Sequence, residues 1–93
     1  MIEIDKKYNA VDVTDISISR NSDAYDVIFS FKSDDSAFEA KLIGVRDVDS
    51  VCELFEAERI WFKKEENNQL QYGSFTLGVS GETYTEIMFD ELA

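Results

Sequence analysis

The sequence has no histidine, no proline and only one cysteine among its 93 residues. Without histidine, the serine–histidine and cysteine–histidine pairs that activate a nucleophile cannot form within the chain, so we do not expect an enzyme. A single cysteine, Cys52, cannot form an intrachain disulfide, which excludes a disulfide-stabilised secreted scaffold. We expect the Cys52 side chain to be buried as a small apolar group.

Basic residues are also scarce, because nine Lys and Arg stand against 20 Asp and Glu, for a net charge of −11. This magnitude exceeds the ~2–8 that is usual for a small soluble domain. It argues against direct binding to DNA or RNA, for which Lys and Arg supply most of the affinity, and it favours a basic protein as partner. Residues 1–46 carry nine acids and six bases, whereas residues 47–93 carry eleven acids and three bases. The acidic half is therefore the C-terminal one.

Long apolar runs are missing as well. The first residues, MIEIDKKYNAVDV, lack the apolar stretch of a signal peptide, and no window reaches the ~18 apolar residues of a membrane span. With 44% hydrophobic residues the chain can still form a core. We predict a single folded domain over residues 1–93, located in the cytoplasm.

Alternating apolar residues predict most of the strands. Residues 2–4 permit a short opening strand, and residues 11–18 change the parity of their apolar positions, which predicts a bulge near Thr14 and Asp15. Residues 25–45 form the strongest pattern, a hairpin with its turn at residues 33–36. Residues 59–63 are expected to form a short strand or to extend the preceding helix. Further strands are expected at 70–79, with a bulge at Gly73, and at 83–90.

Residues 47–58, DVDSVCELFEAE, contain the one clear helical pattern. At 3.6 residues per turn, Val48, Val51, Cys52 and Phe55 share one apolar stripe, and residues 50–53 fit a capping box. Such a short helix is stable only when it packs on a sheet. We therefore predict an α+β fold, a mainly antiparallel sheet of five to seven strands with one helix packed on one face.

No motif for a metal or a cofactor is complete. Asp47, Asp49 and Glu58 resemble the opening of a calcium loop, but Val51 and Cys52 occupy positions that need an oxygen ligand and a glycine. Gly78 and Gly81 lack the lysine and the strand-to-helix context of a phosphate-binding loop. We expect neither a metal nor a cofactor.

The opposite side of the predicted helix carries an acidic ridge formed by Asp49, Glu53 and Glu56. This ridge is either a solvated outer surface or an electrostatic contact for a basic partner. A tight complex would also need apolar anchors, and Trp61, Tyr84 and Met88 are the candidates.

In an extended strand, Trp61 shares a side with Arg59 and Lys63, away from Ile60 and Phe62, unless it packs in the core under the helix. On the last strand, Tyr84 and Met88 alternate with Glu82, Glu86 and Asp90. They would form an apolar centre with an acidic rim if Ile87 and Phe89 are buried.

The run FEAKLIGVRDVDSVCELF, followed by Trp61, SFTLGV and EIMFDEL, resembles the small acidic immunity proteins of bacterial polymorphic toxin systems. The resemblance covers roughly residues 37–92 through the spacing of apolar positions. It implies binding of a toxin without catalysis. We expect an inhibitory protein that occludes a basic partner such as a nuclease toxin, with an oligomeric state that the sequence leaves open.

Two alternatives stay open. A phage anti-defence protein or nucleic-acid mimic would share the acidity but needs a longer charged track, continued by Glu82, Glu86 and Asp90. A non-catalytic adaptor or structural subunit is the other alternative.

Overall fold

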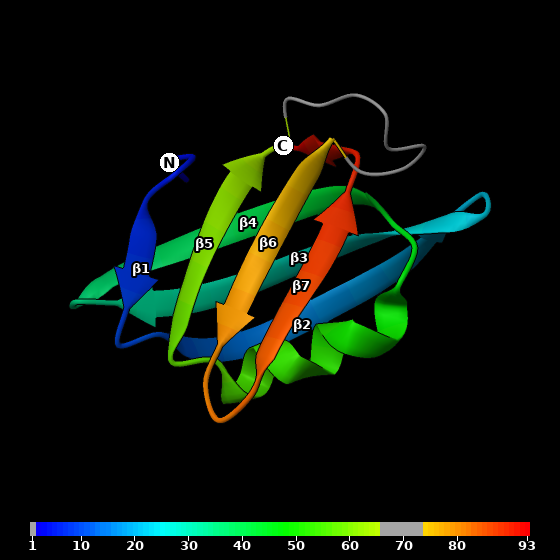
Figure 1. Cartoon of the computed structure of the whole chain (residues 1–93). Coiled ribbons are helices and arrows are strands. Elements are labelled where there is room, and N and C mark those ends of the chain that lie inside the picture. The colour runs from blue at the N-terminus through cyan, green and yellow to red at the C-terminus, as the bar shows by residue number, and fades with distance from the viewer. Residues whose placement is uncertain (1, 66–73) are drawn as a thin grey trace.

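The computed structural model describes residues 2–65 and 74–93. In chain order its elements are β1 (Lys7–Asn9), β2 (Asp12–Asn21), β3 (Ala24–Ser33), β4 (Ser36–Val45), the 3₁₀-helix η1 (Val48–Glu56), β5 (Arg59–Lys64), β6 (Phe75–Ser80), β7 (Tyr84–Phe89) and β8 (Glu91–Leu92). They form two antiparallel four-stranded sheets (Figure 1). The first sheet has the order β1-β5-β6-β7, and the second sheet has the order β2-β3-β4-β8.

The predicted α+β fold, one sheet of five to seven strands covered by a helix, is wrong. Strands hold 63% of the described residues and the helix only 11%, so the protein is mostly β. Several strands alternate between buried and exposed side chains, as the sequence indicates. Their buried side chains meet between the two sheets, an arrangement that gives the same alternation as one sheet packed under a helix.

The core lies between the two sheets. Ring centroids of Phe29 and Phe62 lie 6.4 Å apart, and those of Tyr8 and Phe31 lie 5.5 Å apart, so aromatic contacts join the two sheets directly. The fully buried large side chains come from both sheets and from η1; they are Phe29, Phe31, Phe62, Phe89, Leu42, Leu54, Ile60, Leu77, Ile87, Val27, Val45 and Val51. Burial of such side chains contributes roughly 1.5–3 kcal/mol each.

The second sheet confirms the local predictions best. β3 pairs with both β2 and β4, as expected of a central strand, and the register between β2 and β3 shifts between Val13 and Asp15 at the predicted bulge. Asp34 and Asp35 form the turn between β3 and β4, with φ of 50° and 67°. Two successive left-handed residues are the geometry of a two-residue hairpin whose twist matches its strands.

Other strand predictions are only partly right. Residues 2–4 form no strand, and the first strand is β1 at Lys7–Asn9. The predicted strand at 70–79 is observed as β6 from Phe75 onward, and its proposed bulge at Gly73 lies outside the described residues. Strand β8 has no counterpart in the prediction, because it is too short to show a pattern.

The largest local error in the prediction concerns the helix. η1 is a 3₁₀-helix, so residues three apart lie on one line. The inner line consists of Val48, which is half-buried, and of Val51, Leu54 and Ala57, which are buried. The predicted stripe assumes 3.6 residues per turn and is wrong at two positions. Cys52 is exposed, and Phe55 keeps 54% of its surface accessible.

The start of η1 also differs from the prediction. Asp47 occupies the N-cap position without capping a backbone N–H, and its carboxylate accepts a hydrogen bond from Ser50 Oγ at 2.8 Å. The predicted capping box of residues 50–53 is therefore not formed, because the helix already begins at Val48. Within residues 2–65 and 74–93, no helix combines the length and the apolar character required to cross a membrane.

Candidate protein-binding surface

The three-residue period of η1 divides the predicted acidic ridge. Glu53 and Glu56 are in line with Ser50, whereas Asp49 is in line with the exposed side chains of Cys52 and Phe55. The structure therefore keeps Glu53 and Glu56 together and separates Asp49 from them.

Glu53 and Glu56 meet a third acid, Glu82, across a pocket of about 220 Å³. Glu82 belongs to the turn between β6 and β7, and the rest of the lining consists of Val79, Gly81, Thr83 and Thr85. We call Glu53, Glu56 and Glu82 the acidic flank. Residues 2–65 and 74–93 contain two ion pairs, Lys6–Glu3 and Arg46–Asp90, so no base in these stretches pairs with any acid of this flank.

Close backbone packing holds the acidic flank in place. The N–H of Glu58 donates to the carbonyl of Ser80 at 2.9 Å, which fastens the end of η1 to the end of β6. Gly81 lies so close to η1 that a Cβ built on it would stand 2.5 Å from the backbone oxygen of Glu56. Only glycine permits this approach, and it brings Glu82 beside the helix.

A second groove lies at the edge of β7. Arg46, Asp47, Glu86 and Met88 line this groove, whose volume is also about 220 Å³. It joins two of the predicted site residues, Glu86 and Met88, to the segment that leads into η1.

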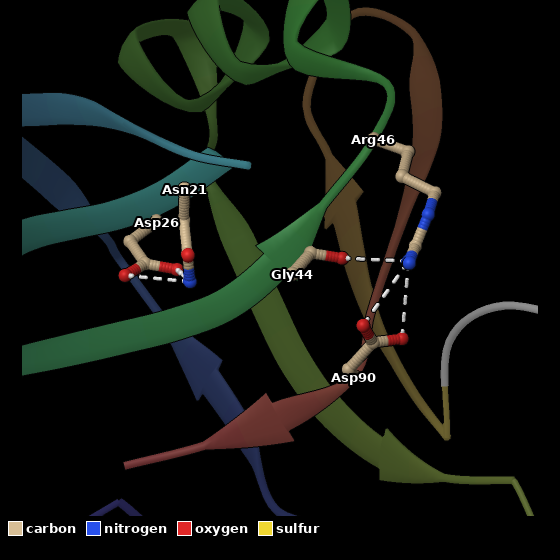
Figure 2. Close-up of polar contacts among 5 residues, drawn as sticks. All are labelled: Asn21, Asp26, Gly44, Arg46 and Asp90. Atoms are coloured by element: carbon tan, nitrogen blue, oxygen red, sulfur yellow. Dashed lines mark hydrogen bonds and ion pairs between the residues drawn. The ribbon is translucent and has the colours of Figure 1, made fainter. Parts of the chain in front are cut away.

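The last predicted acid, Asp90, forms an ion pair with Arg46 within the chain (Figure 2). Arg46 Nη1 lies 3.2 and 3.1 Å from the two carboxylate oxygens of Asp90 and donates to the carbonyl of Gly44 at 3.3 Å. Gly44 has φ +82°, and a Cβ there would meet the Asp90 carboxylate. Asp90 thus fixes the corner where the chain passes from β7 to β8, and Arg46 offsets its charge.

Trp61 and Tyr84 lie on the outer surface of the first sheet. Their rings stack with centroids 5.7 Å apart and an interplanar angle of 19°, and the Trp61 indole covers Gly78. Ile87 and Phe89 are fully buried, so Tyr84 and Met88 point outward with 56% and 37% of their surfaces accessible. The predicted apolar group on this strand is therefore exposed, while its role in binding stays a prediction.

The Tyr84 hydroxyl donates a hydrogen bond of 2.6 Å to a carboxylate oxygen of Glu86. This bond, aided by partial desolvation and by the charge of Glu86, raises the pKa of Tyr84 to about 12. Tyr84 is therefore a hydrogen-bond donor at neutral pH, and it orients the Glu86 carboxylate along the strand.

Three basic residues lie around Trp61. The sequence predicts the outward direction of two of them but not the position of the third. Arg59 and Lys63 point outward with Trp61, as the alternation of β5 predicts. Lys7 adds a third base, with its Nζ 5.7 Å from the centre of the Trp61 ring, because β1 pairs with β5 in that register. A contact between residues so far apart in the chain leaves no local signal in the sequence.

No family model, curated protein or solved structure matches this chain. Across the two described stretches, no group of three or more Cys, Asp or Glu is arranged to hold a metal ion. The described surface thus places acidic side chains beside exposed apolar ones, Phe55 on η1 and Met88 on β7.

Proposed function

We propose that this chain is an inhibitory binding protein of the immunity type, which occludes a basic partner such as a nuclease toxin in the cytoplasm. The observation that carries the proposal is the convergence of Glu53, Glu56 and Glu82 on one pocket. A nuclease site must be positive in order to hold phosphate, so an acidic protein seated on it competes with the nucleic acid.

The acidic flank fits lysine or arginine side chains of the partner. Three carboxylates around a pocket of about 220 Å³ can hold one such side chain and attract others nearby. The field of the whole chain, at net −11, speeds encounter with a basic protein at low salt.

Charge alone gives a weak complex, so the proposal includes apolar contacts beside the acids. Phe55 and Met88 are exposed large apolar side chains, Phe55 on the helix that carries Glu53 and Glu56, and Met88 beside Glu86 at the free edge of β7. Burial of such side chains at the centre of an interface typically supplies most of the affinity.

The nucleic-acid mimic has less support. Mimicry requires a track of unpaired negative charges along the sheet, and Asp90, which would continue that track, is paired with Arg46. A cluster around a pocket suits a protein side chain better than it imitates a phosphate backbone.

The experiment is affinity capture from host lysate at low salt with three immobilised proteins. The first is wild type, and the second carries Glu53→Gln, Glu56→Gln and Glu82→Gln. The third carries Asp15→Asn, Asp26→Asn and Glu39→Gln, three acids on the outer surface of the second sheet, and so has the same net charge as the second.

We expect wild type and the third protein to retain a basic nuclease whose activity they inhibit. The second protein should lose it, because it lacks the acids that contact the partner. Equal loss with both triple variants would show that net charge alone is recognised. Capture of a basic protein without inhibition would favour the adaptor.

A further inference from the structure

The outer face of the first sheet is divided by charge. Lys7, Arg59 and Lys63 point outward from β1 and β5, and Glu86 points outward from β7. Strand pairing places Lys7, Trp61, Gly78 and Glu86 in one row across the four strands. We call this surface the bipolar face. It joins a basic end to an acidic edge on one side of an otherwise acidic protein.

The middle of the bipolar face carries small side chains on β6. The outward residues of β6 are Thr76, Gly78 and Ser80, which are all small, and the Trp61 indole lies over Gly78. Figure 1 shows this sheet toward the viewer, with no described strand or helix in front of it. Small side chains at the centre of a surface allow close approach of another chain.

We propose that the bipolar face docks a second copy of this chain. In a two-fold dimer each residue pair occurs twice, so the surface must be complementary to itself. An axis that runs parallel to the strands, between β5 and β6, reverses the order of the strands while it preserves the rows. Lys7 then faces Glu86 of the second copy, and the strand position of Trp61 faces the strand position of Gly78 in the second copy, where each indole lies over its own Gly78.

The charges favour this face for self-association. Two chains of net charge −11 repel each other, and the bases of the bipolar face offset that repulsion where the two copies meet. Neither Lys7 nor Glu86 forms an ion pair in the described chain. Lys7 lies over its own Trp61 ring and Glu86 accepts a hydrogen bond from its own Tyr84, so within the described residues no opposite charge neutralises either side chain.

The size of the face sets the strength of the dimer. Four strands spaced about 4.8 Å apart give a surface that is smaller than the roughly 800 Å² per partner of a standard interface. The dimer is therefore weak and forms at high protein concentration. This inference is independent of the proposed function, which uses the acidic flank.

The test is sedimentation equilibrium at about 50 mM salt with wild type, Lys7→Glu, Glu86→Lys and an equimolar mixture of the two variants. Each variant alone places like charges opposite each other twice, so we expect self-association at least about tenfold weaker. In the mixture, the two substituted positions face each other with opposite charges, and the unchanged Glu86 of one variant faces the unchanged Lys7 of the other. Association should then return to the wild-type level.

If net charge alone controlled self-association, the expected result for Glu86→Lys would be the opposite. Two charge units separate each variant from −11, so Lys7→Glu has −13 and Glu86→Lys has −9. If repulsion between whole chains decided association, Glu86→Lys would associate more tightly than wild type. The matched control is Lys41→Glu mixed with Glu39→Lys, from the outer face of the second sheet, and its mixture should gain nothing over wild type.

Three results would overturn the proposal. They are a wild type that stays monomeric at about 1 mM protein, a mixture no tighter than the single variants, and self-association unaffected by Lys7→Glu. Because these measurements contain no basic partner, they leave the proposed function untouched.

Discussion

The two ends of the first sheet share one core and carry opposite charge. At one end, β1 and β5 expose Lys7, Arg59 and Lys63 around Trp61. At the other end, β7 exposes Glu86 and lies beside η1, which adds the acidic flank of Glu53, Glu56 and Glu82. A net charge of −11 suggests a uniformly acidic protein, but the fold sorts the charge into regions.

This difference shows how the two regions are built. The acidic flank depends on tertiary packing, because its residues come from a helix and a turn that glycine brings together. The basic end depends on strand register, because alternation along β5 and pairing with β1 place its side chains in rows. Substitutions can therefore disturb one region and spare the other.

The largest effect is expected from detaching the helix that carries the acidic flank. Leu54 is fully buried on the inner line of η1, so Leu54→Ala should lower the free energy of unfolding by about 2–5 kcal/mol in urea denaturation. Phe55→Ala is the control, because the Phe55 side chain is 54% exposed and its loss should cost less than about 1 kcal/mol. Equal losses of unfolding free energy in Leu54→Ala and Phe55→Ala would contradict the three-residue period of η1.

A smaller loss of stability is expected from a substitution that separates η1 from the turn between β6 and β7. Gly81→Ala places a Cβ about 2.5 Å from the backbone oxygen of Glu56, and backbone cannot move aside cheaply. We expect destabilisation of roughly 1–3 kcal/mol. Thr83→Ala, in the same turn and exposed, should stay within about 0.5 kcal/mol of wild type. Full stability of Gly81→Ala would mean that helix and turn are not in contact.

At the basic end, Gly78→Ala should displace the indole of Trp61, because the new Cβ would stand 2.2 Å from the ring. A surface side chain can swing away, so the cost should be only about 1 kcal/mol. The protein has one Trp, so its fluorescence maximum reports this site and should move to longer wavelength. Ser80→Ala, on the same face of β6, should leave the maximum unchanged.

The smallest effect concerns the link between Tyr84 and Glu86. Glu86→Ala removes the hydrogen bond and the charge that raise the pKa of Tyr84 to about 12, so the pKa should fall toward 10. Because the raised pKa belongs to the folded state, its stabilising contribution is complete below pH 10 and is lost as the pH rises to about 12. Ultraviolet titration against Tyr84→Phe isolates this group, and Glu82→Ala should leave it unchanged.

Short-range features of the fold could be predicted from the sequence. The hairpin of β3 and β4 and the bulge in β2 follow from alternation and turn residues within a few positions of each other. The outward direction of Arg59 and Lys63 follows from the same alternation. These features depend on neighbours in the chain.

Features that depend on distant residues could not be predicted. Alternation shows that a strand has one buried face, but the same pattern fits one sheet under a helix and two sheets face to face. The helix type is ambiguous in the sequence because Val48 and Val51 fit both a 3.6-residue and a three-residue period. The two periods differ at Cys52, Leu54 and Phe55. Of the acidic flank, the sequence groups Glu53 and Glu56 but not Glu82. Glu82 lies beside them because Gly81 packs closely against the backbone of Glu56.

The central claim is that Glu53, Glu56 and Glu82 act as one site for a basic partner. Titration of the labelled protein with a hexa-arginine peptide at low salt, followed by NMR, tests it most directly. We predict that the largest shift changes occur at these three residues and at Thr83 and Thr85 in the same pocket, and that salt reduces them. Shift changes spread evenly over all acids, or centred on the outer face of the second sheet, would contradict the claim.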